Sequence, residues 1–142
     1  MTKQTDTIAL IGRILIAVLF ILSGISKAAA PAGTQAYIAS VGLPAPVLAY
    51  FGSMAVELLG SVLLIAGFRV RTVATGMTVY TLLTAVFFHT HFADQNQMIN
   101  FWKNIAIMGG LLQVAAFGAG RFSVDRLFGR KAAPAGRLAS QI

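Results

Sequence analysis

Four long apolar runs divide the chain, with polar stretches between them. The runs cover residues 8–27, 46–68, 72–91 and 99–119. A helix rises about 1.5 Å per residue, so about twenty residues are needed to cross the roughly 30 Å hydrocarbon core of a bilayer. The pattern therefore predicts an all-α integral membrane protein folded as a four-helix bundle.

The segment between the first two runs is too short to cross a membrane. Helix breakers stand on both sides of residues 34–41, namely Pro31, Gly33, Gly42, Pro44 and Pro46. Such a bracketed piece predicts a short helix lying at the membrane surface. We expect one membrane domain over residues 1–125, followed by a basic cytoplasmic tail over residues 126–142.

The composition supports a membrane location. The chain has 142 residues, of which 57% are hydrophobic and 11% are charged, and these values are atypical of a soluble domain. It has no cysteine, which excludes a disulfide framework and thiol redox chemistry, so redox work would need a bound molecule. The net charge of +7 comes mainly from residues beside the apolar runs, which argues against a nucleic-acid partner.

The positions of the basic residues predict an orientation. With four crossings, one side of the membrane receives Lys3, Arg69, Arg71, Arg121, Arg126, Arg130, Lys131 and Arg137. The opposite side receives Lys27 and Lys103. Because lysine and arginine are enriched in cytoplasmic segments, both termini are predicted to be cytoplasmic.

Glu57 stands in the middle of the second run, which is expected to form one unbroken helix. A charge near the centre of a bilayer costs several kcal/mol unless it faces a polar partner, so we expect Glu57 to be buried between helices. One interpretation is a functional or structural polar cluster, and the other is an ion pair with Arg13. Arg13 has an alternative of its own, because its long side chain can extend to the cytoplasmic head groups.

Several other polar residues are expected at similar depth to one another, around a cavity with Glu57 at its floor. The candidate ligand-binding or buried polar cluster comprises Arg13, Lys27, Glu57, Tyr80, His89, His91, Lys103 and Asn104. Such a pocket suits an anionic or polar head group, or a quinone carbonyl that needs hydrogen-bond and proton donors. Lys27 and Lys103 can alternatively extend to the membrane surface. His89 and His91 would diverge on a helix, so no metal site is predicted, and no catalytic residue is assigned.

The order of these residues resembles that of a known family. The pattern comprises Arg13, Ser23-Gly24 with Lys27, Gly42-Leu43-Pro44, Glu57 with Gly60 and Gly67, His89, Phe101-Trp102-Lys103-Asn104 and Gly109-Gly110. It resembles the DoxX family of small bacterial inner-membrane proteins over about residues 8–125. The resemblance implies a four-helix fold in the bacterial inner membrane. It also implies, as in some relatives, an association with quinone-linked sulfur oxidation or with membrane oxidoreductase complexes.

Three functions are consistent with these observations. The favoured one is an accessory or quinone-linked component of a membrane oxidoreductase system, working with redox partner proteins rather than as a stand-alone enzyme. The second is a carrier or binding protein for a small molecule. Four unbroken spans argue against a complete transporter in one chain, but a homo-oligomer could supply one. The third is a non-catalytic assembly or scaffold subunit.

Overall fold

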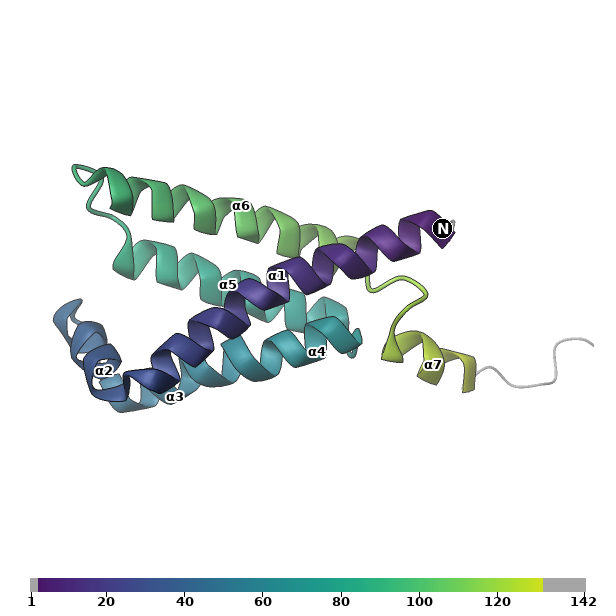
Figure 1. Cartoon of the computed structure of the whole chain (residues 1–142), viewed down its shortest axis with the longest axis horizontal. Helices are drawn as coiled ribbons and strands as arrows, with labels where there is room; N and C mark the ends of the chain where they lie inside the picture. Colours follow the sequence, from purple (N-terminus) through teal and green to yellow (C-terminus); the bar gives the residue numbers. More distant parts are fainter. Residues whose placement is uncertain (1–2, 132–142) are drawn as a thin grey trace, which may run out of the picture.

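The computed structural model describes residues 3–131 and is helical from end to end, with short connections and no strand in that range (Figure 1). The elements are α1 (Lys3–Ala29), α2 (Pro31–Ser40), α3 (Pro46–Met54), the π-helical turn η1 (Ala55–Leu59), α4 (Gly60–Ala66), α5 (Val70–Phe88), α6 (Gln95–Phe117) and α7 (Val124–Lys131). The prediction of an all-α fold with a short helix between the first two spans is confirmed.

Four long rods make the bundle, because α3, η1 and α4 run on as one rod. Figure 1 shows α1 crossing the other rods obliquely, α2 at one end of the bundle, and the N-terminus with α7 at the other end. Three rods are long and apolar enough to cross a membrane, namely α1, Pro46–Ala66 and α5. The fourth, α6, has 23 residues, but its amide side chains and Lys103 make it more polar than the other three. The crossing by α6 therefore stays a prediction.

Several helix ends differ from the predicted ones. The surface helix α2 begins at Pro31, because proline suits the first turn of a helix, where the missing N–H has no partner to lose. The third rod ends at Phe88 rather than at residue 91. The fourth begins at Gln95 rather than at residue 99, because the Asp94 side chain accepts a hydrogen bond from the Asn96 N–H and caps the helix.

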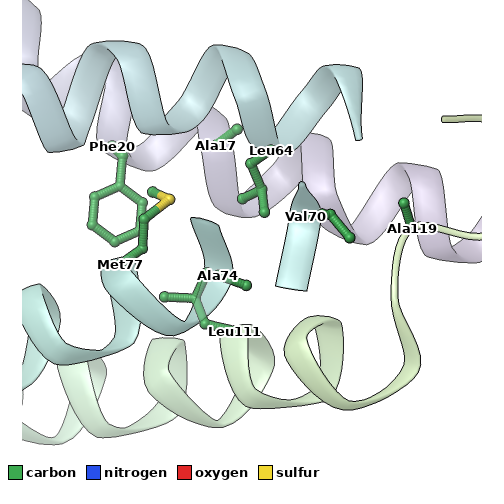
Figure 2. Close-up of a cluster of buried hydrophobic side chains, with 8 residues drawn as sticks. All are labelled: Ala17, Phe20, Leu64, Val70, Ala74, Met77, Leu111 and Ala119. Atoms are coloured by element: carbon green, nitrogen blue, oxygen red, sulfur yellow. The ribbon is translucent and has the colours of Figure 1, made fainter. Parts of the chain in front are cut away.

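A buried core of small and apolar side chains joins the rods. It consists of Ala17, Phe20, Leu64, Val70, Ala74, Met77, Leu111 and Ala119, which Figure 2 shows pointing toward one another. Gly24 lets α1 come close to η1, since a Cβ there would lie 2.6 Å from Leu58 Cδ2. Close approach at a glycine is typical of helices that pack inside a membrane. The hydrophobic effect does not drive helices together there, so they associate through van der Waals packing, which small residues permit.

The end of the described chain is tied to the bundle. Residues 126–131 of the predicted tail belong to α7, and residues 132–142 lie outside the described residues. The Asp125 carboxylate accepts hydrogen bonds from the N–H groups of Arg69 and Val70, at 2.7 and 3.0 Å. The Asp125 N–H in turn donates to the carbonyl of Gly67. These contacts fix the start of α7 to the turn between α4 and α5.

Candidate functional site

Glu57 lies in a π-helical turn inside the second rod, which otherwise runs on as one helix from Pro46 to Ala66. The Gly60 N–H donates to the carbonyl of Ala55, five residues back, where an α-helix would use the residue four back. The widened turn is stabilised by the Ser61 hydroxyl, which donates to the Glu57 carbonyl at 2.5 Å. Single π-helical turns inside α-helices are frequent at functional sites.

One oxygen of the Glu57 carboxylate joins three rods. Its Oε1 atom accepts hydrogen bonds from Lys27 Nζ at 2.5 Å, from Ser23 Oγ at 3.1 Å and from Tyr80 OH at 2.7 Å. Lys27 Nζ also donates to Ser23 Oγ at 2.8 Å. The Glu57 side chain is 4% exposed and the Lys27 side chain 24%, so the ion pair is largely shielded from its surroundings. Lys27 therefore extends inward to the carboxylate rather than outward to the membrane surface.

The other oxygen of Glu57 has no such partner. Oε2 is buried and makes no hydrogen bond within residues 3–131. A buried acceptor without a donor costs about 1–3 kcal/mol. The cluster therefore keeps one buried acceptor whose hydrogen bonding is unsatisfied, and a donor that reached Oε2 would recover this free energy.

A pocket of about 710 Å³ adjoins this cluster. Its volume is within the range of small-molecule sites, which are mostly apolar with a few polar groups. The polar residues that line it are Ser23, Lys27, Thr34, Ser53, Glu57, Tyr80, Thr84, His89, Asn100, Lys103 and Asn104. The rest of the lining is apolar apart from Tyr37 and Gly52. It comes from α1, α2, α3, η1, α5 and α6, with Leu43 from the connection between α2 and α3.

The pocket brings together six of the eight candidate residues. They are Lys27, Glu57, Tyr80, His89, Lys103 and Asn104. His89 follows the last residue of α5, and its Nδ1 lies 2.9 Å from Oε1 of Gln97, which fixes the ring between α5 and α6. The described residues hold no group of three or more His, Asp or Glu side chains that could bind a metal. Hydrogen-bond donors dominate the polar lining instead.

Arg13 lies elsewhere, and the interpretation that pairs it with Glu57 was wrong. Its Nη1 donates to the carbonyls of Leu64 and Ile65 at 2.9 and 3.1 Å, and its Nη2 donates to the carbonyl of Phe122 at 2.6 Å. The register of α1 explains this position. Because Gly24 faces η1, Arg13 stands about three helical turns away, beside the end of α4. It is fully buried, so it does not extend to the head groups either.

His91 also lies outside the pocket. It is exposed in the turn between α5 and α6, because α5 ends at Phe88. The third predicted span, over residues 72–91, therefore does not reach His91.

Three polar residues with defined partners were missed. Ser23 bonds both members of the ion pair, and its place one turn before Lys27 could have indicated this. Asp6 is fully buried, and its Oδ1 accepts from the Arg121 N–H at 2.9 Å. Asp6 stands two turns before Arg13 on the same face of α1, which was a usable signal. Nothing in the local sequence of Asp125 indicates its cap on α5.

Comparison with known proteins now decides the family. The family model described as DoxX matches residues 8–90, more than half of the chain. The chain belongs to the DoxX family. This DoxX-family chain is 39% identical to the inner membrane protein YqjF of Escherichia coli K12 over 131 residues, covering 92% of this chain and 99% of YqjF. It is 40% identical to the inner membrane protein YphA of the same organism over 123 residues, covering 82% of this chain and 87% of YphA. No solved structure matches it.

The family, the two relatives and the three apolar rods together identify an inner-membrane protein that lies in a lipid bilayer. The family match spans α1 to α5 and therefore includes Lys27, Glu57 and Tyr80.

Proposed function

We propose that this DoxX-family protein holds a quinone head group in the pocket beside Glu57, as an accessory component of a membrane oxidoreductase system. The observation that carries the proposal is a buried carboxylate with one free oxygen at the edge of a 710 Å³ pocket. A quinone is an apolar ring with polar carbonyls, and the pocket offers the same combination of an apolar lining and a few polar groups.

The donors of the pocket suit a quinone carbonyl. Lys27 and Tyr80 already direct their hydrogens at Glu57 Oε1, and a ligand carbonyl beside them could share those donors. His89 stands at the end of α5 and adds its ring nitrogens to the polar groups of the pocket lining. Glu57 Oε2 can accept a hydrogen bond from the hydroxyl of the reduced ring. A bound quinone would supply the coupled electron and proton chemistry, and a redox partner protein would supply the electrons.

The arrangement of the rods gives such a ligand a route from the bilayer. Figure 1 shows α1 and α6 separating toward the end of the bundle that carries α2. Three apolar residues of the pocket lining are also exposed on the outside of the bundle, namely Leu19 (48%), Leu83 (49%) and Phe87 (43%). At the α2 end, the rings of Tyr37 and Phe88 lie 5.2 Å apart and cover the pocket. A molecule dissolved in the lipid can thus enter from the side.

Titration of the purified protein in lipid nanodiscs with decylubiquinone, followed by calorimetry, tests the proposal. The wild-type protein should bind, and Glu57→Gln should weaken binding at least about tenfold, because the Lys27 pair and the acceptor oxygen are altered. His91→Ala is the matched control, since this candidate residue lies outside the pocket, and it should bind like the wild type. Absence of binding by the wild type, or equal binding by Glu57→Gln, would reject the quinone.

The π-helical turn favours a second function, a carrier for a small polar molecule. It widens the regular helix at the ion pair, and single π-helical turns inside α-helices are frequent at functional sites. In a homodimer, each chain could supply half of the route by which the molecule crosses the membrane. Solid-supported membrane electrophysiology with small organic anions and amines tests this function. Currents that Glu57→Gln abolishes would support it, and an absence of current for all solutes would remove it.

We further infer that α6 is a fourth crossing, so that both termini are cytoplasmic. The support is its length of 23 residues and the excess of basic residues on the predicted cytoplasmic side. Fluorescent-protein and alkaline phosphatase fusions at each terminus test both statements. Four crossings place the two reporters on the same side of the membrane, whereas three crossings place them on opposite sides.

A further inference from the structure

A second pocket, of about 390 Å³, lies at the opposite end of the bundle from Lys27 and His89. Its lining includes three arginines, Arg69, Arg71 and Arg126, together with the backbone of Gly118–Gly120. All three arginines are exposed. In the part of the chain that the structure describes, their guanidinium groups make no hydrogen bond or ion pair, although the Arg69 and Arg126 backbone N–H groups do.

The connection between α6 and α7 is shaped to admit a guanidinium. Gly118 and Gly120 have positive φ angles of 81° and 72°, so the chain bends sharply there. A Cβ on Gly118 would lie 3.5 Å from Arg71 Nε, which places the Arg71 guanidinium directly against this glycine. The Arg71 side chain therefore packs against Gly118 at this pocket.

The one carboxylate of this pocket is already occupied. Both oxygens of Asp125 accept hydrogen bonds from the backbone at the start of α5, from the N–H groups of Arg69 and Val70. The N-terminal end of a helix also carries a partial positive charge. The three guanidinium groups are thus left to face an anion from outside the protein.

The pocket lies at the level where a membrane presents its head groups. Arg69 follows the end of one membrane-spanning rod, and Arg71 is in the first turn of the next. Along the chain near Arg126, three apolar side chains are exposed, namely Phe122 (52%), Leu127 (62%) and Phe128 (59%). Side chains of this kind next to basic residues are typical of a surface that inserts into the acyl boundary of a bilayer.

We propose that Arg69, Arg71 and Arg126 bind the phosphate of an anionic phospholipid, while Phe122, Leu127 and Phe128 contact its acyl chains. Basic pockets beside membrane helices attract anionic head groups, and each arginine near the surface strengthens binding about fivefold. The exposed apolar residues distinguish a lipid from free phosphate, because free phosphate has no acyl chain to bury.

Native mass spectrometry of the full-length protein, released from mixed nanodiscs, tests the proposal. The nanodiscs contain equal amounts of phosphatidylglycerol and phosphatidylcholine with identical acyl chains. The wild type should retain phosphatidylglycerol selectively, and the double variant Arg71→Gln with Arg126→Gln should lose about 25-fold of this selectivity. Arg121→Gln removes the same charge from an exposed neighbour outside the pocket lining, and it should change the selectivity less than about twofold.

Two outcomes would overturn the lipid assignment. One is an equal loss in Arg121→Gln, which would show a general charge effect rather than a site. The other is release of the retained lipid by inorganic phosphate at millimolar concentration, which would show a site for free anions. Thermal unfolding of all variants checks that they fold. Decylubiquinone binding should be unchanged in the double variant, so this proposal and the proposed function fail independently.

Discussion

Arg13 and Glu57 are among the charged groups buried in this bundle, Arg13 toward the α7 end and Glu57 toward the α2 end. Each keeps one atom without a hydrogen-bond partner within residues 3–131, Arg13 Nε and Glu57 Oε2. Their surroundings differ. Arg13 is bonded to three backbone carbonyls and lies against Gly67, where a Cβ would come within 2.6 Å of its Nη1. Glu57 is bonded to side chains and borders a pocket of about 710 Å³.

The comparison teaches that a buried charge by itself does not indicate a ligand site. Backbone carbonyls cannot move without moving their helix, so the contacts of Arg13 hold α1, α4 and the chain before α7 together. Side chains such as Lys27 and Tyr80 can redirect their hydrogens toward a ligand at small cost. We therefore assign Arg13 to the stability of the bundle and propose Glu57 for binding.

The largest expected effect tests the structural role assigned to Arg13. Arg13→Met keeps the apolar stem but leaves the carbonyls of Leu64, Ile65 and Phe122 without this donor, and it should lower the free energy of unfolding by about 2–4 kcal/mol. Unfolding in dodecyl sulfate, followed by the fluorescence of the single tryptophan, measures this change. Arg121→Met, an exposed control, should change it by less than about 0.5 kcal/mol. Equal values for both variants would mean that Arg13 has no structural role.

A smaller effect is expected where α1 meets η1. Gly24→Ala places a methyl group 2.6 Å from Leu58 Cδ2, so α1 must shift away from the ion pair, and unfolding should become easier by about 1–3 kcal/mol. Gly12 lies on the same helix with no atom within 4 Å of an added Cβ. Gly12→Ala should therefore stabilise the protein by about 0.5–1 kcal/mol through helix propensity. The same sign for both variants would contradict the close approach at Gly24.

The smallest expected effect tests the binding role proposed for Glu57 and its partners. Tyr80→Phe removes the hydroxyl that donates to Glu57 at 2.7 Å, and the affinity for decylubiquinone should fall about tenfold, because a hydrogen bond to a charged group contributes about 1.5 kcal/mol. Tyr37→Phe is the control, because Tyr37 lines the same pocket and its hydroxyl has no partner among the described residues. Calorimetry should show unchanged affinity for this control, and an equal loss would remove the special role of Tyr80.

The sequence was sufficient to predict the burial of Glu57, and helical periodicity accounts for the buried face of α1. Burial of a charge follows from its cost in lipid, which does not depend on the neighbours. The buried face formed by Arg13, Ala17, Phe20 and Gly24 follows from helical periodicity. The partner of Glu57 could not be predicted in this way. It depends on the register between α1 and η1, which is set by the contact of Gly24 with Leu58.

Two further features were beyond the sequence pattern for different reasons. The end of α5 at Phe88 was hidden because aromatic residues continue through Phe92, although Asp94 offered a visible cap for the next helix. The π-helical turn has no composition signal, since its residues are ordinary helix formers. It depends on how Glu57 meets Lys27 and Tyr80 across three rods, and that is a tertiary property.

The most direct test of the central claim uses the absence of cysteine from the chain. Ser53 and Ser61 stand on either side of Glu57, and each donates to a backbone carbonyl, but Ser53 lines the pocket and Ser61 is fully buried. The rate at which a small methanethiosulfonate reagent modifies Ser53→Cys and Ser61→Cys is the measurement. The account predicts that Ser53→Cys reacts at least about tenfold faster and that decylubiquinone slows its reaction. Equal rates, or a Ser53→Cys rate that decylubiquinone leaves unchanged, would contradict a ligand pocket beside Glu57.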